Sequence, residues 1–205
     1  MQIKKAEVRE NIIEAARHEF LKNGFSGTSL RSIVKSAGCS LSNFYNYFDT
    51  KERLFEAVVM PAVEQIKVIF EGMKKISLPN GMLMQSYDAE KEKLGYIFNF
   101  VQDNKESLWL VVHGSEGSHI AGYKDFAVET ITDIWMDYIT HIKSISGVEI
   151  SRFFIKNACS FYVNAVVELL KYEASREEMK KWGEEILDFT YYGFKRLIEN
   201  QKKGE

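Results

Sequence analysis

Residues 28–51, TSLRSIVKSAGCSLSNFYNYFDTK, are the stretch that decides the fold of this chain. Their pattern predicts two short helices joined by a tight turn, followed at once by the start of a third. Thr28 is the expected N-cap of the first helix, which carries apolar residues at helical spacing. Gly38 is expected to end that helix, because the residue just past a helix often needs a left-handed backbone that glycine adopts at little cost.

The second helix of the pair is expected to begin at Ser40, whose side chain can cap it. Phe44 and Phe48 lie four residues apart and therefore share one face, which we assign to the core. The opposite face carries polar and tyrosine side chains: Ser42, Asn43, Tyr45, Asn46 and Tyr47. A helix of about two turns with an aromatic anchor and a polar outer face suits the major groove of DNA, which is about 12 Å wide.

The order and spacing of several residues in this region are also informative: Gly24, Thr28, Ile33, Ala37, Gly38, Ser40, Tyr45, Phe48, Lys51, Glu52 and Leu54. Together with the preceding segment 12–25, this pattern resembles the TetR family of bacterial transcriptional regulators over roughly the first sixty residues. The chain departs from the family at Ser42, where glycine is common. Because that position lies close to DNA in the family, the resemblance does not carry base specificity over to this chain.

The resemblance implies an all-α fold, with an N-terminal three-helix helix-turn-helix DNA-binding head joined to a larger helical ligand-binding and dimerisation body. We expect the DNA-binding domain in residues 1–50 and the regulatory domain in residues 61–205, with a connecting helix at about 51–60. In the family, the last two long helices pair with those of a partner in a four-helix dimer interface. Here this implies dimerisation through residues of about 150–172 and 176–200.

Patterns within the body are helical, and strand alternation is not seen in the sequence. Apolar residues at helical spacing predict helices over 94–101, 126–145, 153–169 and 179–197. Ser175 and Glu178 predict an S-x-x-E capping box before the last of them. Gly183 and Gly193 would allow close helix approach at the dimer interface, and tolerated glycines are the alternative. The clearest turn is Leu78-Pro79-Asn80-Gly81.

The connecting helix is expected to begin near Asp49, which with Glu52 gives a start that resembles a capping box. Pro61 predicts a kink or break farther along, because proline removes a backbone donor. A kink there would either tune the coupling between head and body or be passive geometry.

Composition indicates a cytoplasmic protein with reduced cysteines. The 205 residues contain two cysteines, Cys39 and Cys159, which does not suggest a disulfide framework. Neither a signal peptide nor an apolar run of the roughly 20 residues that a membrane span needs is recognised. Residues 1–60 hold nine basic and seven acidic residues, so charge by itself does not decide for DNA binding. A dimer would double this basic surface.

Candidate DNA contacts follow from chemistry and from the resemblance. Thr28 and Lys51 are expected at phosphates, because helix N-termini and lysines favour anions. Asparagine can pair with adenine and leucine can touch a thymine methyl group. The resemblance places Tyr45 and Tyr47 at the DNA backbone, with core packing as the alternative, and Arg31 is either a DNA contact or a solvated side chain. The complete set is Thr28, Arg31, Ser40, Leu41, Ser42, Asn43, Tyr45, Asn46, Tyr47 and Lys51.

The body is rich in amphipathic aromatic side chains, which offer a stacking surface and a polar tip. We therefore expect an apolar or aromatic ligand among Trp109, His113, Tyr123, Phe126, Trp135, Tyr138 and Tyr162. Core packing is the alternative for each of them.

Other chemistry is weakly indicated. His113, Glu116 and His119 include two metal-ligand types, but glycines intervene and one helix cannot hold all three on one face, so a metal site is not predicted. The run 113–117 lacks the first glycine of G-x-S-x-G, and phosphate and dinucleotide motifs are missing, so neither an enzyme nor a cofactor is expected. Cys39 is expected to be a small buried hydrophobe, with a redox-sensing thiol as the alternative.

The sequence therefore predicts a ligand-responsive, homodimeric transcriptional regulator. We expect a repressor that a small apolar or aromatic inducer releases from a palindromic double-stranded DNA operator, and activation stays open. The alternative is a helical protein that binds a ligand or partner and has lost sequence-specific DNA binding. The polar face from Ser40 to Tyr47 favours the regulator, because ligand storage and enzymatic work do not need it.

Overall fold

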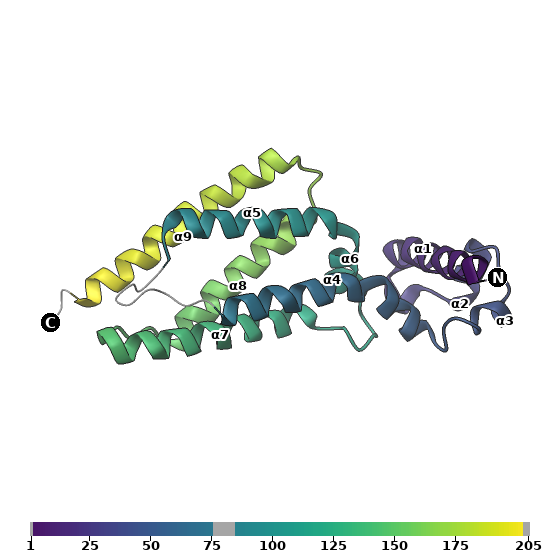
Figure 1. The fold of residues 1–205 in the computed structure, drawn as a ribbon, viewed down its shortest axis with the longest axis horizontal. Coiled ribbons are helices and arrows are strands. Elements are labelled where there is room, and N and C mark those ends of the chain that lie inside the picture. The colour runs from purple at the N-terminus through teal and green to yellow at the C-terminus, as the bar shows by residue number, and fades with distance from the viewer. Residues whose placement is uncertain (1, 76–84, 203–205) are drawn as a thin grey trace. The chain divides into compact units, whose positions relative to one another are not determined.

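The computed structural model describes residues 2–75 and 85–202, and all the regular structure in them is helical (Figure 1). The helices are α1 (Gln2–Gly27), α2 (Leu30–Ser36), α3 (Leu41–Phe44), α4 (Lys51–Lys74), α5 (Tyr87–Asp103), α6 (Lys105–Trp109), the π-helical turn η1 (Leu110–Gly114), α7 (Tyr123–Ser146), α8 (Arg152–Leu169) and α9 (Arg176–Lys202). The predicted all-α class is confirmed. The predicted turn at residues 78–81 lies outside the described residues.

The chain forms two compact units. The first comprises Met1–Val68 and Asn104–Lys124, and the second comprises Ile69–Asp103 and Asp125–Glu205. The first unit thus holds α1 to α3, most of α4, α6 and η1. The functional division into a DNA-binding domain and a regulatory domain stays a prediction.

The first unit has a core of aromatic and branched side chains. Phe20 and Phe55 are fully buried and meet edge-on, with ring centroids 5.0 Å apart. Leu110 and Val111 of η1 enter the same core, so a segment far along the chain completes the packing of the N-terminal helices. Burial of this kind contributes about 1.5–3 kcal/mol for each large apolar side chain and is the main force that holds these short helices together.

Two of the predicted local features around α3 are confirmed, and one is wrong. Gly38 has a φ of 63°, and the Ser40 hydroxyl accepts a hydrogen bond from the Asn43 amide at 3.1 Å. The N-cap of α2, however, is Ser29, whose hydroxyl accepts from the Ser32 amide at 3.1 Å. Thr28 cannot cap α2 because its buried hydroxyl points back to α1.

The start of α4 also differs from the prediction. Thr50 takes the capping position, where its hydroxyl accepts a hydrogen bond from the Arg53 amide at 3.1 Å. Glu52 instead turns away and accepts a hydrogen bond from the backbone amide of His119 at 2.9 Å. The capping box between Asp49 and Glu52 is therefore not formed.

Pro61 lies inside α4, which continues without a break from Lys51 to Lys74. Of the predicted kink or break, the break is therefore wrong, and a kink stays a prediction. Proline removes one helical hydrogen bond, but Val59, Ala62 and Val63 on either side are buried. The packing of these side chains offsets the loss of that hydrogen bond and keeps α4 helical at Pro61.

The second unit contains α5, α7, α8 and α9. Ile142, Ile155 and Ile198 bring three of these helices, α7, α8 and α9, into one core. The predicted capping box is confirmed: the Ser175 amide donates to Glu178 Oε2 at 2.9 Å, and the Glu178 amide donates to Ser175 Oγ at 3.2 Å. In the part of the chain that the structure describes, none of the helices combines the length and apolarity that a membrane crossing requires.

Gly183 has a packing role within the chain. A Cβ placed on Gly183 would lie 1.9 Å from a ring carbon of Phe98. Because glycine has no Cβ, α9 can pack closely against α5 (Figure 1). The close helix approach expected at Gly183 is therefore made inside the chain. A Cβ on Gly193, in contrast, would meet nothing within 4 Å.

Candidate nucleic-acid interface

Two buried phenylalanine rings, those of Phe44 and Phe48, anchor α3 to the core of the first unit. Phe44 is fully buried and Phe48 is 5% exposed, and their ring centroids are 5.8 Å apart. The assignment of both rings to the core is therefore confirmed. Because α3 is only one turn long and is followed by a turn at residues 45–47, this anchor rather than helix length fixes its orientation.

The opposite face of α3 and the following turn is open to solvent. Its exposed members are Ser40, Leu41, Ser42, Tyr45 and Asn46, and Asn43 is half-buried. The Asn46 side-chain amide donates to Asn43 Oδ1 at 3.4 Å, which keeps both amide groups at this surface. Tyr45 is 51% exposed although its ring meets the edge of Phe44. The surface therefore combines hydroxyl, amide and apolar groups within one turn of chain.

Arg31 and Tyr47 flank this face in different ways. Arg31 is exposed on α2. Tyr47 is half-buried and packs against the core of the first unit, as the packing alternative for this residue describes. DNA contact by either residue stays a prediction.

Thr28 and Lys51, the predicted phosphate contacts, are engaged inside the protein. The Thr28 hydroxyl donates to the carbonyl oxygens of Gly24 at 2.7 Å and Glu19 at 3.1 Å. The Lys51 ammonium donates to the carbonyl oxygens of Phe25 at 2.7 Å and Thr28 at 2.9 Å. Both side chains therefore hold the end of α1, and phosphate binding by them stays a prediction.

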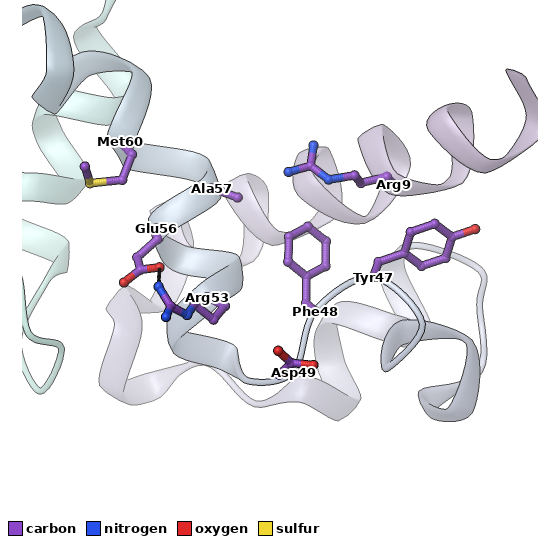
Figure 2. A pocket seen from close by; sticks show the side chains of 8 residues that line it. All are labelled: Arg9, Tyr47, Phe48, Asp49, Arg53, Glu56, Ala57 and Met60. Carbon is purple, nitrogen blue, oxygen red and sulfur yellow. Dashed lines mark hydrogen bonds and ion pairs between the residues drawn. The ribbon is translucent and has the colours of Figure 1, made fainter. Parts of the chain in front are cut away.

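Beside the anchor lies an open groove of about 410 Å³ between α1, the start of α4 and the loop between α3 and α4 (Figure 2). It is lined by Arg9, Tyr47, Phe48, Asp49, Arg53, Glu56, Ala57 and Met60. The Arg9 guanidinium lies 5.2 Å from the centre of the Phe48 ring, and Arg53 pairs with Glu56 at 2.8 Å. Arg9 was not predicted from the sequence, because its place beside Phe48 depends on how α1 packs in the tertiary structure.

The aromatic residues proposed for the ligand fall in both units. In the first, Trp109 and His113 have ring centroids 4.3 Å apart, and Tyr123 packs on the core. In the second, Trp135 and Tyr138 meet edge-on with centroids 5.6 Å apart.

The two remaining members of that set also lie in the second unit. Phe126 is 56% exposed, and the Tyr162 hydroxyl contacts Thr190. Burial raises the pKa of the Tyr138 hydroxyl to about 12 and raises that of Tyr162, so both are neutral donors at neutral pH. None of the seven lines the groove of Figure 2.

The surroundings of the histidine and cysteine side chains bear on metal binding and thiol reactivity. Within residues 2–75 and 85–202, histidine, cysteine and acidic side chains do not gather in groups of three that could hold a metal ion. The His119 ring lies between two carboxylates of α4, in contact with Glu52 and 3.1 Å from Glu56. Burial raises the pKa of the Cys39 thiol, which disfavours the reactive thiolate at neutral pH.

Known proteins resemble this chain in both sequence and fold. Residues 12–58 match the family model of bacterial regulatory proteins of the tetR family. The uncharacterized HTH-type transcriptional regulator YdgC of Bacillus subtilis (strain 168) is 25% identical over 160 residues, which cover 69% of this chain and 82% of YdgC.

Solved structures share the fold. A transcriptional regulator (TerR/AcrR family) from Aquifex aeolicus VF5 matches with a TM-score of 0.61 and 19% identity, covering 89% of this chain and 98% of its own. NalD, the secondary repressor of the MexAB-OprM multidrug efflux pump in Pseudomonas aeruginosa, matches with a TM-score of 0.59 and 18% identity over 90% of this chain and 95% of its own. The matched segment contains the whole helix-turn-helix described above, and this chain is therefore a transcriptional regulator of the TetR family.

Proposed function

We propose that this regulator is a homodimeric repressor that binds a palindromic operator and is released from it by a small apolar or aromatic inducer. The observation that carries the proposal is the exposed face of α3, held outward by the buried rings of Phe44 and Phe48. Two such faces, one from each protomer, would enter successive major grooves about 34–36 Å apart.

Base reading is assigned to side chains whose chemistry fits base edges. Asn43 and Asn46 can each pair with the N6 and N7 atoms of an adenine, and Leu41 can contact a thymine methyl group. Ser42 lies exposed in α3, and its hydroxyl can donate to or accept from a base. Tyr45 has half of its surface free for the DNA backbone. These positions together define the proposed specificity of the regulator.

Dimerisation is assigned to α8 and α9. Exposed large aromatic side chains gather on these two helices: Phe153 at 80%, Phe161 at 44%, Phe189 at 77% and Tyr192 at 56% exposure. Apolar surface of this kind is costly in water and marks interaction sites. A second copy of the chain is the proposed partner, because a twofold operator requires two identical heads.

The inducer is assigned to the second unit, where the Trp135 ring of α7 lies edge-on to Tyr138 of the same helix and to Phe194 of α9. These rings offer aromatic edges to an apolar ligand. Release requires that the ligand bind better to the conformation that does not fit the operator. A coupling free energy of about 1–3 kcal/mol changes operator affinity about 5- to 150-fold. NalD has the same fold and is a repressor, which favours repression over activation in this proposal.

The test uses an operator recovered by selection from random double-stranded DNA. Tyr45→Ala is expected to weaken binding about tenfold or more in fluorescence anisotropy while the far-ultraviolet circular dichroism stays that of the wild type. Asn23→Ala is the control, because this exposed side chain donates to the Glu19 carbonyl of its own helix and lies outside the proposed contact surface. Equal affinity of the Tyr45→Ala and wild-type proteins would remove Tyr45 from the proposed contact surface.

A further inference from the structure

The ammonium group of Lys51, in the first turn of α4, is held by the last turn of α1 and the residue that follows it. It donates hydrogen bonds to the carbonyl oxygens of Phe25 at 2.7 Å and Thr28 at 2.9 Å. The same nitrogen lies 4.2 Å from the centre of the Phe25 ring, a distance at which a cation is attracted to the ring face. An ammonium group has three N–H donors, and two of those of Lys51 are already used inside the protein.

The segment that Lys51 grips is the turn from which the helix-turn-helix starts. Gly24 breaks the helical path of α1 with a φ of 68°, and Ser29 caps α2 only two residues after the Gly27 end of α1. The carbonyl oxygens of such a turn lack helical partners. Lys51 supplies partners for the carbonyls of Phe25 and Thr28, and the Thr28 hydroxyl supplies one for Gly24.

The residues that Lys51 binds also pack in the core of the first unit. The ring of Phe25 meets that of Phe55 edge-on, with centroids 5.1 Å apart, and Phe55 lies one turn after Lys51 on α4. Thr28 itself is 3% exposed. One charged group and one aromatic contact, both from α4, therefore help to hold the chain where α2 leaves α1.

We propose that Lys51 is a positioning residue for operator binding, which acts through the carbonyls of Phe25 and Thr28 rather than through a DNA phosphate. The proposal rests on the proposed function. By fixing the entry of α2, Lys51 fixes the Gly38 turn and, after it, the exposed face of α3. A neutral side chain at position 51 would leave the turn free to sample other directions.

Salt dependence separates the two roles. Each phosphate contact adds about 0.9 to the slope of log affinity against log salt concentration, because it releases condensed counterions. A positioning lysine contributes to affinity without contributing to that slope. The substitutions for the test are Lys51→Met, which keeps the apolar stem, and Lys51→Arg, which keeps the charge and N–H donors. Lys35→Met on α2 is the control, because it removes the same charge from an exposed position of the head.

Operator affinity is measured by fluorescence anisotropy between about 50 and about 200 mM salt, well below the unfolding temperature of each variant. Lys51→Met is expected to bind about tenfold more weakly with the wild-type salt slope, and Lys51→Arg to regain affinity. Hydrogen exchange without DNA is expected to be faster at the Thr28 amide, which donates to the Phe25 carbonyl.

The proposal would be overturned if Lys51→Met lowered the salt slope by about 0.9, the contribution of one phosphate contact, and left hydrogen exchange at the Thr28 amide unchanged. Lys51 would then be a direct DNA contact. Unchanged affinity in folded Lys51→Met protein would overturn the proposal as well. A wild-type protein that selects no DNA sequence would instead contradict the proposed function, while faster exchange in Lys51→Met would still show that Lys51 holds the turn.

Discussion

Glu52 and His119 connect the start of α4 to the segment that follows η1. The His119 amide donates to Glu52 Oε1 at 2.9 Å, and the His119 ring contacts the same carboxylate. The other ring nitrogen lies 3.1 Å from Glu56. A contact between residues 67 positions apart thus fastens the 115–122 segment to the helix that directly follows the helix-turn-helix.

Loss of this connection is expected to destabilise the first unit. Glu52→Ala removes a charge-assisted hydrogen bond from the His119 amide and a contact with the half-exposed His119 ring, together about 1 kcal/mol. Urea unfolding measures the change. Glu64→Ala is the matched control on the same helix, because Glu64 forms an ion pair with exposed Lys67 whose loss is expected to cost less than about 0.5 kcal/mol. Equal effects of the two substitutions would contradict a specific role for Glu52.

Gly183 and Gly193 of α9 form a pair with opposite expected effects. Alanine at Gly183 places a methyl group into the Phe98 ring and is expected to lower the free energy of unfolding by about 1–3 kcal/mol. Alanine at Gly193 meets no neighbour of its own chain and is expected to raise it by about 0.5–1 kcal/mol. Thermal unfolding measures both. Partial rescue of Gly183→Ala by Phe98→Leu would confirm the contact, and destabilisation by Gly193→Ala would point to packing against a second copy.

The two serine caps of the second unit are expected to differ in pH dependence. The Ser175 hydroxyl and amide hold the pKa of Glu178 below its usual value, so this carboxylate adds stability that is present at neutral pH and is lost as pH falls through the lowered pKa. The destabilisation by Ser175→Ala should therefore shrink in acid. Ser151→Ala is the control, because Ser151 caps α8 with a phenylalanine, Phe154, at the corresponding position. A pH-independent effect of Ser175→Ala in urea unfolding would contradict this account.

The proposed dimer surface is tested by charge substitution. Phe189→Glu places a carboxylate at an aromatic that is 77% exposed in the single chain. If this ring is a central contact, its loss should raise the dimer dissociation constant about 30-fold or more in sedimentation velocity. Tyr96→Glu on α5 is the control, since it alters an exposed aromatic outside the proposed surface. A variant that dimerises as tightly as the wild type would move the interface elsewhere.

Local chemistry in the sequence predicts most of the helix-turn-helix. Gly38 and Ser40 were predictable because a left-handed turn and an N-cap each depend on residues within one turn of chain. Thr28 and Ser29 both suit an N-cap, and the choice between them is made by the α1 carbonyls that hold the Thr28 hydroxyl. Such tertiary competition is not visible in a local pattern.

Contacts between distant residues were not predictable. The grip of Lys51 on Phe25, and the packing of Gly183 on Phe98, join segments whose meeting depends on the whole fold. The possible break at Pro61 was wrongly expected for the same reason, because the buried neighbours beside it in the continuous helix α4 are recognised only in the structure. The amphipathic helices of the second unit and the Ser175 capping box follow from periodicity and spacing alone.

DNA reading by the exposed face of α3 is tested most directly by selecting the sequences that the wild-type protein binds from random double-stranded DNA. The fluorescence anisotropy of the enriched sequence is then measured at low and high salt. The proposed function predicts one palindromic motif with half-sites about one helical turn apart, bound by a dimer with an affinity that falls as salt rises. Enrichment of no sequence by a folded, dimeric, ligand-free sample would contradict it, because the exposed face of α3 would then not read DNA.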